Sequence, residues 1–205
     1  MALGAGSVTP WQMARAYTVF ATGGYKVEPY IVQKIVDDRG NLLAQAQPVP
    51  AGDPNLRVID PRNAFLMDSM LHDVVRRGTA ARANSMGRKD LAGKTGTTND
   101  LVDAWFTGYQ PGIVAVTWVG FDQPKKLGGN ETGAVAALPI WIDYMAKALQ
   151  DVPEVFMPVP TGIVTASVSE NAGRESRIEY FYQENLPPAV PSEPSQGGKE
   201  ETPPP

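Results

Sequence analysis

The chain has 205 residues, 42% of them hydrophobic and 20% charged, and that length is enough to bury the core of one domain. Its 18 basic and 22 acidic residues give a formal charge of −4, so nucleic acid and anionic membrane surfaces are poor candidates as partners. The absence of cysteine excludes disulfides, thiolate metal sites and cysteine nucleophiles. The longest apolar stretch, residues 112–121, is about half of the ~20 residues that cross a bilayer, and the first residues lack a signal-peptide pattern.

The first predicted elements are a helix and a hairpin. Thr9-Pro10 is typical of a helix start and a glycine pair follows Thr22, so the apolar stripe between them predicts a helix over 10–22. The β-branched and aromatic run 30–36 is followed by the turn sequence Asp-Asp-Arg-Gly and then by Leu42. This order predicts a hairpin whose second strand begins at Leu42.

A second helix is predicted to begin at Asp60-Pro61. Apolar residues with helical spacing follow and end at Gly78, and we expect this stripe to face the core. The polar segment 78–90 comes next, and its basic residues indicate a solvated connector: Arg82, Arg88 and Lys89.

Three strands and a last helix follow. The strands are predicted over 91–97, 104–109 and 113–121, and the short turn between the last two makes them an antiparallel hairpin. Residues 134–149 predict a helix with one apolar side, formed by Ile140, Trp141, Tyr144, Met145 and Leu149. Helices, then strands, then a helix that packs back over them indicate an α+β fold, an antiparallel sheet packed by helices.

The sequence divides into a main part and two C-terminal segments. We expect a domain over 1–150 and an extended segment over 151–186 that packs on it. Residues 187–205 contain seven prolines, and their only aliphatic side chain larger than alanine is Val190. Such a segment cannot bury enough apolar surface to offset the entropy of ordering it, so we predict a disordered tail.

Common cofactor and metal patterns do not fit. Gly4-Ala5-Gly6 lacks the strand and the third glycine of a dinucleotide loop, and residues 128–133 contain no lysine for a phosphate loop. His72 is the single histidine and falls inside a predicted helix, so we interpret it as a core residue. We therefore expect no metal and no cofactor.

One segment does carry chemistry: Lys94-Thr95-Gly96-Thr97-Thr98, at the end of a predicted strand. On an edge strand, the lysine supplies positive charge and the hydroxyls supply hydrogen-bond donors. A glycine between them allows the backbone of a substrate to approach closely. The pattern predicts a wall that binds an anion.

This string is the third motif of the penicillin-binding proteins and serine β-lactamases, and further stretches resemble class A penicillin-binding proteins. They include Ser7-Val8-Thr9-Pro10, Ala14-Arg15-Ala16-Tyr17, the segments 20–25 and 28–30, Arg77-Gly78-Thr79-Ala80 and Asp103-Ala104-Trp105-Phe106-Thr107-Gly108-Tyr109. Glu131-Thr132-Gly133-Ala134 and Ala137-Leu138-Pro139-Ile140-Trp141 are similar to the Gram-negative 1A type. The resemblance extends over about residues 1–186 and implies part of a serine β-lactamase or penicillin-binding transpeptidase-like fold.

The nucleophile motif of that family, Ser-x-x-Lys, does not occur here. No serine is followed by a lysine three positions later. Ser169-Glu170-Asn171 fits the second motif by its letters, but it follows Lys94 by more than seventy positions, whereas in the family it precedes the Lys-Thr-Gly motif. The chain therefore resembles the C-terminal part of a transpeptidase domain, and we expect it to be inactive alone.

The resemblance implies acyl transfer in peptidoglycan synthesis, in which a serine attacks a D-Ala-D-Ala stem peptide and a second stem peptide completes the crosslink. Lys94, Thr95 and Thr97 would bind the terminal carboxylate of the peptide or of a β-lactam, with Gly96 and Thr98 in the same strand. The backbone N–H of Thr97 would be one of two oxyanion donors, and Trp105 and Phe106 would pack under the strand.

For the whole protein, the resemblance implies a membrane anchor, a glycosyltransferase domain and a place at the periplasmic face of the inner membrane. Its partners would be peptidoglycan stem peptides, β-lactams and the rest of the transpeptidase domain. Two alternatives stay open at this point. One is a non-catalytic module that binds peptidoglycan or a partner protein, and the other is a self-sufficient hydrolase, which the missing Ser-x-x-Lys opposes.

Overall fold

The computed structural model describes residues 6–50, 52–168 and 176–187. The chain divides into two compact units, Met1–Thr161 and Gly162–Pro205. The predicted disordered tail lies outside the described residues except for Pro187. The expected domain limits at 150 and 186 stay predictions.

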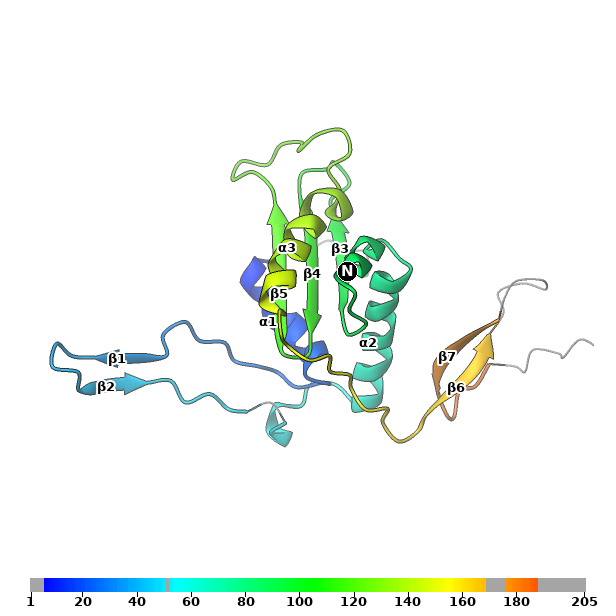
Figure 1. The fold of residues 1–205 in the computed structure, drawn as a ribbon, viewed down its shortest axis with the longest axis horizontal. Helices are drawn as coiled ribbons and strands as arrows, with labels where there is room; N and C mark the ends of the chain where they lie inside the picture. The colour runs from blue at the N-terminus through cyan, green and yellow to red at the C-terminus, as the bar shows by residue number, and fades with distance from the viewer. Residues whose placement is uncertain (1–5, 51, 169–175, 188–205) are drawn as a thin grey trace, which may run out of the picture. The chain divides into compact units, whose positions relative to one another are not determined.

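The centre of the first unit is a three-stranded antiparallel sheet (Figure 1). It consists of β3 (Ala92–Thr97), β4 (Ala104–Gln110) and β5 (Ile113–Val119), in that spatial order. The three predicted strands are confirmed to within two residues at each end. The register places Gly96 opposite Trp105, and β3 is an edge strand within the described part of the chain.

Three helices accompany the sheet: α1 (Pro10–Ala21), α2 (Pro61–Arg76) and α3 (Leu138–Ala148). Thr9 caps α1 in a capping box, in which its hydroxyl accepts from the N–H of Gln12 and the Gln12 side chain accepts from the N–H of Thr9. The carboxylate of Asp60 caps α2 by accepting a 2.9 Å bond from the backbone N–H of Arg62, two residues later. Both predicted helix starts are confirmed.

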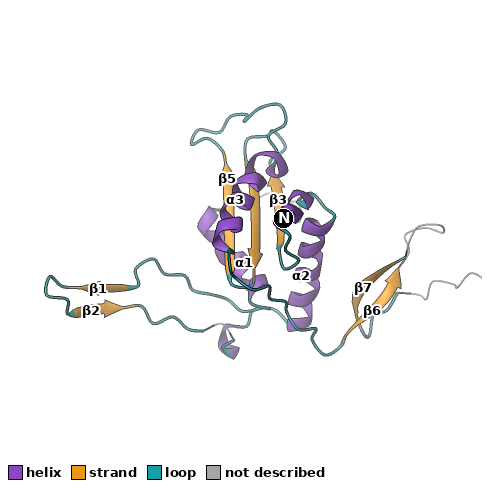
Figure 2. Cartoon of the chain, in the orientation of Figure 1, coloured by secondary structure: helices purple, strands orange, loops and turns teal. Residues whose placement is uncertain are grey.

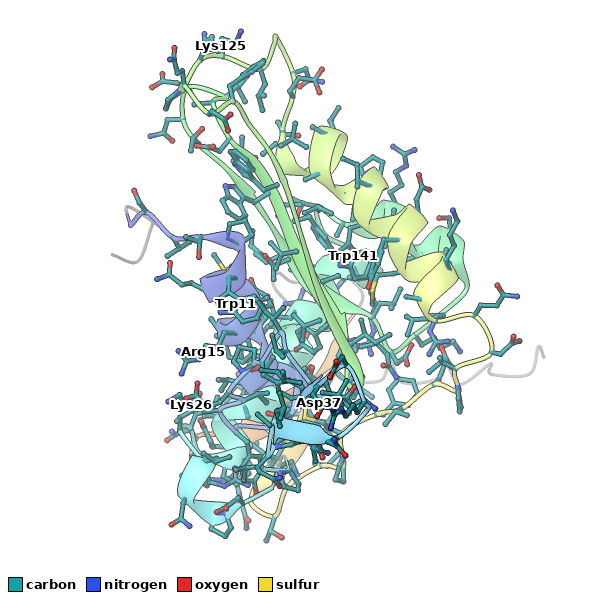
Figure 3. All side chains as sticks on the ribbon, turned by 90° about the vertical axis from the view of Figure 1, so that its left-hand side faces the viewer. Trp11, Arg15, Lys26, Asp37, Lys125 and Trp141 are labelled. Atoms are coloured by element: carbon teal, nitrogen blue, oxygen red, sulfur yellow. The ribbon has the colours of Figure 1, made fainter. Side chains whose placement is uncertain are left out.

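The helices lie on both faces of the sheet (Figures 1 and 2). Phe106 and Tyr109 are three positions apart on β4, so their side chains point to opposite faces. Phe106 packs edge-on against Trp141 of α3, with ring centroids 5.0 Å apart, and Figure 3 shows Trp141 between α3 and the sheet. Tyr109 packs against Tyr17 of α1 and donates a hydrogen bond to Asp68 of α2. The unit therefore has three layers, helix–sheet–helix.

Two clusters of buried side chains form the core, one on each face. The larger lies under α3 and contains Val75, Leu91, Phe106, Leu138, Trp141, Met145 and Leu149, with smaller alanines between them. The other lies under α1 and α2 and contains Ala21, Leu71, Ala92 and Tyr109. The apolar stripe predicted for α2 supplies residues to both clusters.

The last predicted helix differs from expectation in two ways. A π-helical turn, η3 (Gly133–Ala137), precedes α3, so the helical segment is not one regular α-helix. Ile140 and Tyr144 face outward, with 51% and 56% of their surface exposed, because only Trp141 and its neighbours one turn apart meet the sheet. The sequence predicts one apolar side formed by five residues, but Ile140 and Tyr144 do not pack in the core with the other three.

In the segment 78–90, Arg82 and Lys89 are exposed as the prediction of a solvated connector requires, but Arg88 is not. The segment contains a 3₁₀ helix, η2 (Ala81–Met86), and then a buried ion pair. Arg88 donates two bonds of 2.9 and 2.7 Å to the fully buried carboxylate of Asp90, and a third of 2.7 Å to the carbonyl of Val152. The connector thus fastens the chain beyond α3 to the start of β3.

The remaining elements are short. The predicted first hairpin is confirmed as β1 (Lys34–Val36) and β2 (Leu42–Gln45), both exposed along their whole length, and η1 (Pro54–Leu56) follows. In the second unit, β6 (Ile163–Val168) and β7 (Arg177–Tyr182) form an antiparallel pair. Among the described residues, no helix is both long enough and apolar enough to cross a bilayer.

Candidate functional site

The Lys-Thr-Gly-Thr string lies where β3 leaves the core. Ala92 and Gly93 are buried, Thr95 and Gly96 are half-buried, and Lys94 is exposed. Because β3 pairs only with β4 in the described part of the chain, its outer edge is open along this string. An open edge presents backbone N–H and C=O groups that an added peptide segment can pair with.

Lys94 carries the positive charge of this edge. It stands opposite Thr107 in the register, and its ammonium donates a 3.0 Å bond to the carbonyl of Thr95, one residue further along the strand. The ammonium group therefore lies along the strand itself. Two of its three protons remain for other acceptors.

The hydroxyl of Thr95 lies 2.8 Å from the hydroxyl of Thr79. Thr79 belongs to the loop that follows α2, so this contact joins two segments sixteen positions apart. Thr79 is exposed and Thr95 is half-buried. Thr79 comes from the Arg77–Ala80 stretch, which the sequence singled out only as a family resemblance.

The hydroxyl of Thr97 accepts a 3.0 Å bond from the backbone N–H of Gly133. Gly133 lies so close to the sheet that a Cβ there would be 2.3 Å from the carbonyl oxygen of Trp105 and 2.6 Å from that of Gly96. Only glycine fits this position. The sequence singled out Glu131–Ala134 only as a family resemblance, and nothing in the spacing of the glycines at 128–133 indicated a contact with β3.

Gly96 and the aromatic residues of β4 are packed together. A Cβ on Gly96 would lie 3.2 Å from the Cβ of Trp105, its register partner. Trp105 in turn packs against Trp118, with ring centroids 6.1 Å apart. Phe106 is fully buried. A side chain at position 96 would therefore press on Trp105, so the neighbouring strand favours glycine here, whatever binds at the open edge.

Thr98 has a different environment from the other hydroxyl residues of the string. Its hydroxyl accepts two bonds of 2.9 Å, from the N–H groups of Val102 and Asp103, and so closes the turn between β3 and β4. Leu101 in this turn has a positive φ of 54°, and its carbonyl accepts from Leu127 in the loop after β5. Thr98 thus organises the loops beyond the strand, whereas Thr95 and Thr97 project from the strand itself.

Buried polar side chains of α2 contact the start of β3 and the neighbouring strand β4. Nδ1 of His72 lies 2.8 Å from the carbonyl oxygen of Leu91, the residue before β3, and Nε2 lies 3.3 Å from Asp68. Asp68 accepts a 2.6 Å bond from the Tyr109 hydroxyl, and burial, together with the Asp68 charge, raises the pKa of Tyr109. The phenol is therefore protonated and can donate this bond at neutral pH. The interpretation of His72 as a core residue is confirmed.

The geometry agrees with what comparison with known proteins finds. The family model described as penicillin binding protein transpeptidase domain matches residues 1–140. The penicillin-binding protein 1A of Neisseria lactamica is 50% identical over 167 residues, which are 82% of this chain and 21% of that protein. That of Pseudomonas aeruginosa is 41% identical, with 93% of this chain and 29% of that protein covered.

A solved structure also matches. The crystal structure of penicillin-binding protein 1A from Haemophilus influenzae superposes with a TM-score of 0.80 at 37% identity, and the match covers 88% of this chain and 33% of that one. A helix–sheet–helix unit with Lys-Thr-Gly-Thr on its edge strand is therefore part of a transpeptidase-type α+β domain. The chain belongs to the penicillin-binding protein transpeptidase family. It spans between a fifth and a third of the length of these relatives.

Proposed function

We propose that the open edge of β3 binds the terminal carboxylate of a peptidoglycan stem peptide, as the C-terminal part of a D,D-transpeptidase domain. The observation that carries the proposal is the placement of one ammonium group and two hydroxyl groups along an open edge strand, at Lys94, Thr95 and Thr97. An ammonium and two O–H donors suit a carboxylate, and the backbone edge suits the extended peptide behind it. Membership of the transpeptidase family supports the same assignment.

In the proposed reaction, a serine oxygen attacks the carbonyl carbon of the penultimate D-Ala. The peptide bond breaks, the terminal D-Ala leaves with a proton on its nitrogen, and an acyl ester remains on the serine. An amine of a second stem peptide then attacks the ester, forms the crosslink and restores the serine hydroxyl. The N–H of Thr97 is one of two donors that stabilise the oxyanion of each tetrahedral intermediate.

The serine of this reaction has no counterpart among the serines of this sequence, since none has a lysine three positions later. We therefore propose that the 205 residues supply the carboxylate-binding strand and that the nucleophile lies elsewhere in the same transpeptidase domain. The site would face the periplasm, with a membrane anchor and a glycosyltransferase domain in the whole protein. A β-lactam, which carries a carboxylate next to its reactive amide, would occupy the same strand.

The second candidate function is a non-catalytic module that binds peptidoglycan or a partner protein. It would use the same exposed strand but would not need a serine, and the missing Ser-x-x-Lys motif favours it. The two candidates differ in one respect that can be measured. Only the first requires that the strand, once joined to a nucleophile, supports acylation by penicillin.

The test is a chimera in which residues 7–150 of this chain replace the matching stretch of the Neisseria lactamica protein. We expect the chimera to be acylated by a fluorescent penicillin. Lys94→Ala removes a charge-assisted hydrogen bond to the carboxylate and should slow acylation about 10- to 150-fold. Lys147→Ala, which removes an exposed lysine of α3, is the matched control and should leave the rate unchanged.

Two results would decide against the proposal. If the chimera folds but is not acylated, the module that only binds is the better description. If the chimera is acylated and Lys94→Ala reacts at the unaltered rate, the ammonium group does not hold the carboxylate. Circular dichroism and the melting temperature of each variant show whether it is folded.

A further inference from the structure

Each of the two hydroxyl groups on β3 has a hydrogen-bond partner in another segment. The partner of Thr97 is a backbone N–H, and the partner of Thr95 is a side-chain hydroxyl. Thr97 accepts from the N–H of Gly133, so the proton of its own hydroxyl is left to donate. Thr95 lies 2.8 Å from the hydroxyl of Thr79, and in that pair either oxygen can be the donor. The direction of the Thr95 bond therefore depends on what else it binds.

A carboxylate can only accept hydrogen bonds. If Thr95 donates to a bound carboxylate, its oxygen must accept from Thr79, because one hydroxyl carries one proton. The result is a chain of hydrogen bonds that runs from Thr79 to Thr95 to the ligand. Such chains strengthen each bond by mutual polarisation.

Thr79 is held firmly enough to play this part. The chain turns back on itself after α2, so that the N–H groups of Gly78 and Ala80 both donate to the carbonyl of Val74, at 3.1 and 3.0 Å. A Cβ on Gly78 would lie 2.8 Å from the Cα of Val74, so the turn requires glycine. Ala80 is fully buried, and Thr79 is thereby fixed between a tight turn and the core.

The end of α2 is fastened a second time by a side chain of η2. The side-chain nitrogen Nδ2 of Asn84 donates to the carbonyls of Val75 and Arg76, at 3.0 and 3.1 Å. These bonds satisfy two of the free carbonyls at the helix C-terminus. The loop that carries Thr79 is consequently anchored on both sides.

We propose that Thr79 is a positioning residue for carboxylate binding, whose hydroxyl donates to Thr95 and directs the Thr95 proton toward the ligand. This inference rests on the proposed function of β3. It assigns a role to the Arg77–Ala80 stretch, and it makes the substrate-binding strand dependent on the loop after α2. Thr79 itself does not contact the carboxylate.

The experiment uses the 205-residue chain labelled with ¹⁵N, and with ¹³C in the threonine methyl groups. The probes are N-acetyl-D-Ala-D-Ala and its C-terminal amide, which lacks the carboxylate. The proposed function predicts that the acid binds and that its C-terminal amide does not. Binding is observed as shifts of the backbone N–H signals of residues 94–98. Dissociation constants are then measured for each variant.

We expect Thr79→Val to weaken binding of the acid by about three- to tenfold, the range for one lost neutral hydrogen bond. Thr79→Ser keeps the hydroxyl and should bind within a factor of about two of the unaltered chain. In a chain that already carries Thr95→Val, Thr79→Val should cause no further loss, because its only route to the ligand is gone. Thr165→Val, at an exposed threonine of β6, is the matched control.

The outcomes separate this inference from the proposed function. If Thr79→Val binds the acid as tightly as the unaltered chain does, the positioning role is overturned and the proposed function stands. If the acid binds no better than the amide, the proposed function fails and the positioning role fails with it. The methyl signal of Thr95 tests the contact separately: a shift in Thr79→Val larger than the shift in the control supports the Thr79–Thr95 hydrogen bond, and no such shift overturns the positioning role even where the acid binds. If Thr79→Val does not fold, Thr79→Ala is read in the same way.

Discussion

At the scale of single residues, the side chains along β3 differ in what holds them. Thr95 depends on another side chain, Thr97 on a backbone N–H, and Lys94 on the carbonyl of its own strand. A backbone donor survives most substitutions, whereas a side-chain donor does not. The contributions of these residues to binding can therefore be separated by substitution.

Thr97→Ala should slow acylation of the chimera less than Lys94→Ala does. The substitution removes the hydroxyl but keeps the backbone N–H that we assign to the oxyanion, and it removes no charge. Second-order acylation rates of the two variants, measured side by side, test this order. A larger loss in Thr97→Ala would mean that the hydroxyl, and not the ammonium group, provides the main contact.

The ion pair of Arg88 and Asp90 predicts a dependence of stability on pH. Burial alone would raise the pKa of Asp90, but the hydrogen bonds from Arg88 and from the N–H of Val155 outweigh burial and lower it. The pKa of Asp90 in the folded state is therefore below the ordinary value of about 3.9. The stability that the charged carboxylate adds to the fold is present above pH ~3.9 and is lost as the pH falls through the folded-state pKa.

Removing Arg88 tests that pair directly. Arg88→Ala leaves the fully buried Asp90 carboxylate without its charged partner and should destabilise the chain by about 3–5 kcal/mol. Urea unfolding at neutral pH measures the loss. Arg82→Ala, at an exposed arginine of η2, is the control and should change stability by less than about 0.5 kcal/mol. Equal stability of the two variants would show that the ion pair contributes nothing.

At the scale of elements, β3 is held in place by segments from both faces of the sheet. α2 fixes its start, through His72 and the carbonyl of Leu91. The loop after α2 fixes its middle at Thr95, and η3 fixes its end through Gly133 and Thr97. An edge strand is otherwise the part of a sheet that opens most easily, so these contacts give the site a defined shape.

Gly133 is the element-scale contact that can be tested most directly. Gly133→Ala would place a Cβ 2.3 Å from the carbonyl oxygen of Trp105, so η3 must move away from the sheet. We expect a loss of about 1–3 kcal/mol in stability and loss of the Thr97 contact. Gly129→Ala, where a Cβ would meet nothing within 4 Å, is the control. Thermal unfolding and the backbone amide signal of residue 133 measure the two effects, and equal melting temperatures would refute the close approach.

At the scale of the whole molecule, the sequence contains the proposed carboxylate-binding strand but no Ser-x-x-Lys motif. The 205-residue chain should therefore form no covalent adduct with benzylpenicillin, because no serine has the activating lysine. Intact-mass measurement after incubation should show the unmodified mass. A stoichiometric adduct would contradict the proposed division of the domain and would identify the true nucleophile by peptide mapping.

The sequence by itself determined the local features of this protein. The caps at Thr9 and Asp60 and the strand at Lys94–Thr97 follow from interactions between residues close in the chain, and the structure has them where the sequence predicts them. The family resemblance was also readable from short strings, since the Lys-Thr-Gly-Thr motif and its flanking segments occur in order.

Only the tertiary structure decided which residues meet across the chain. Thr79 contacts Thr95 across 16 positions of the chain, and Gly133 contacts Thr97 across 36. Arg88 contacts Val152 across 64 positions. Periodicity cannot indicate such pairs, because it reports which face of an element is apolar and not which segment covers that face. For the same reason the sequence placed Ile140 and Tyr144 on one apolar side with Trp141, whereas in the structure Trp141 is buried and these two side chains are exposed.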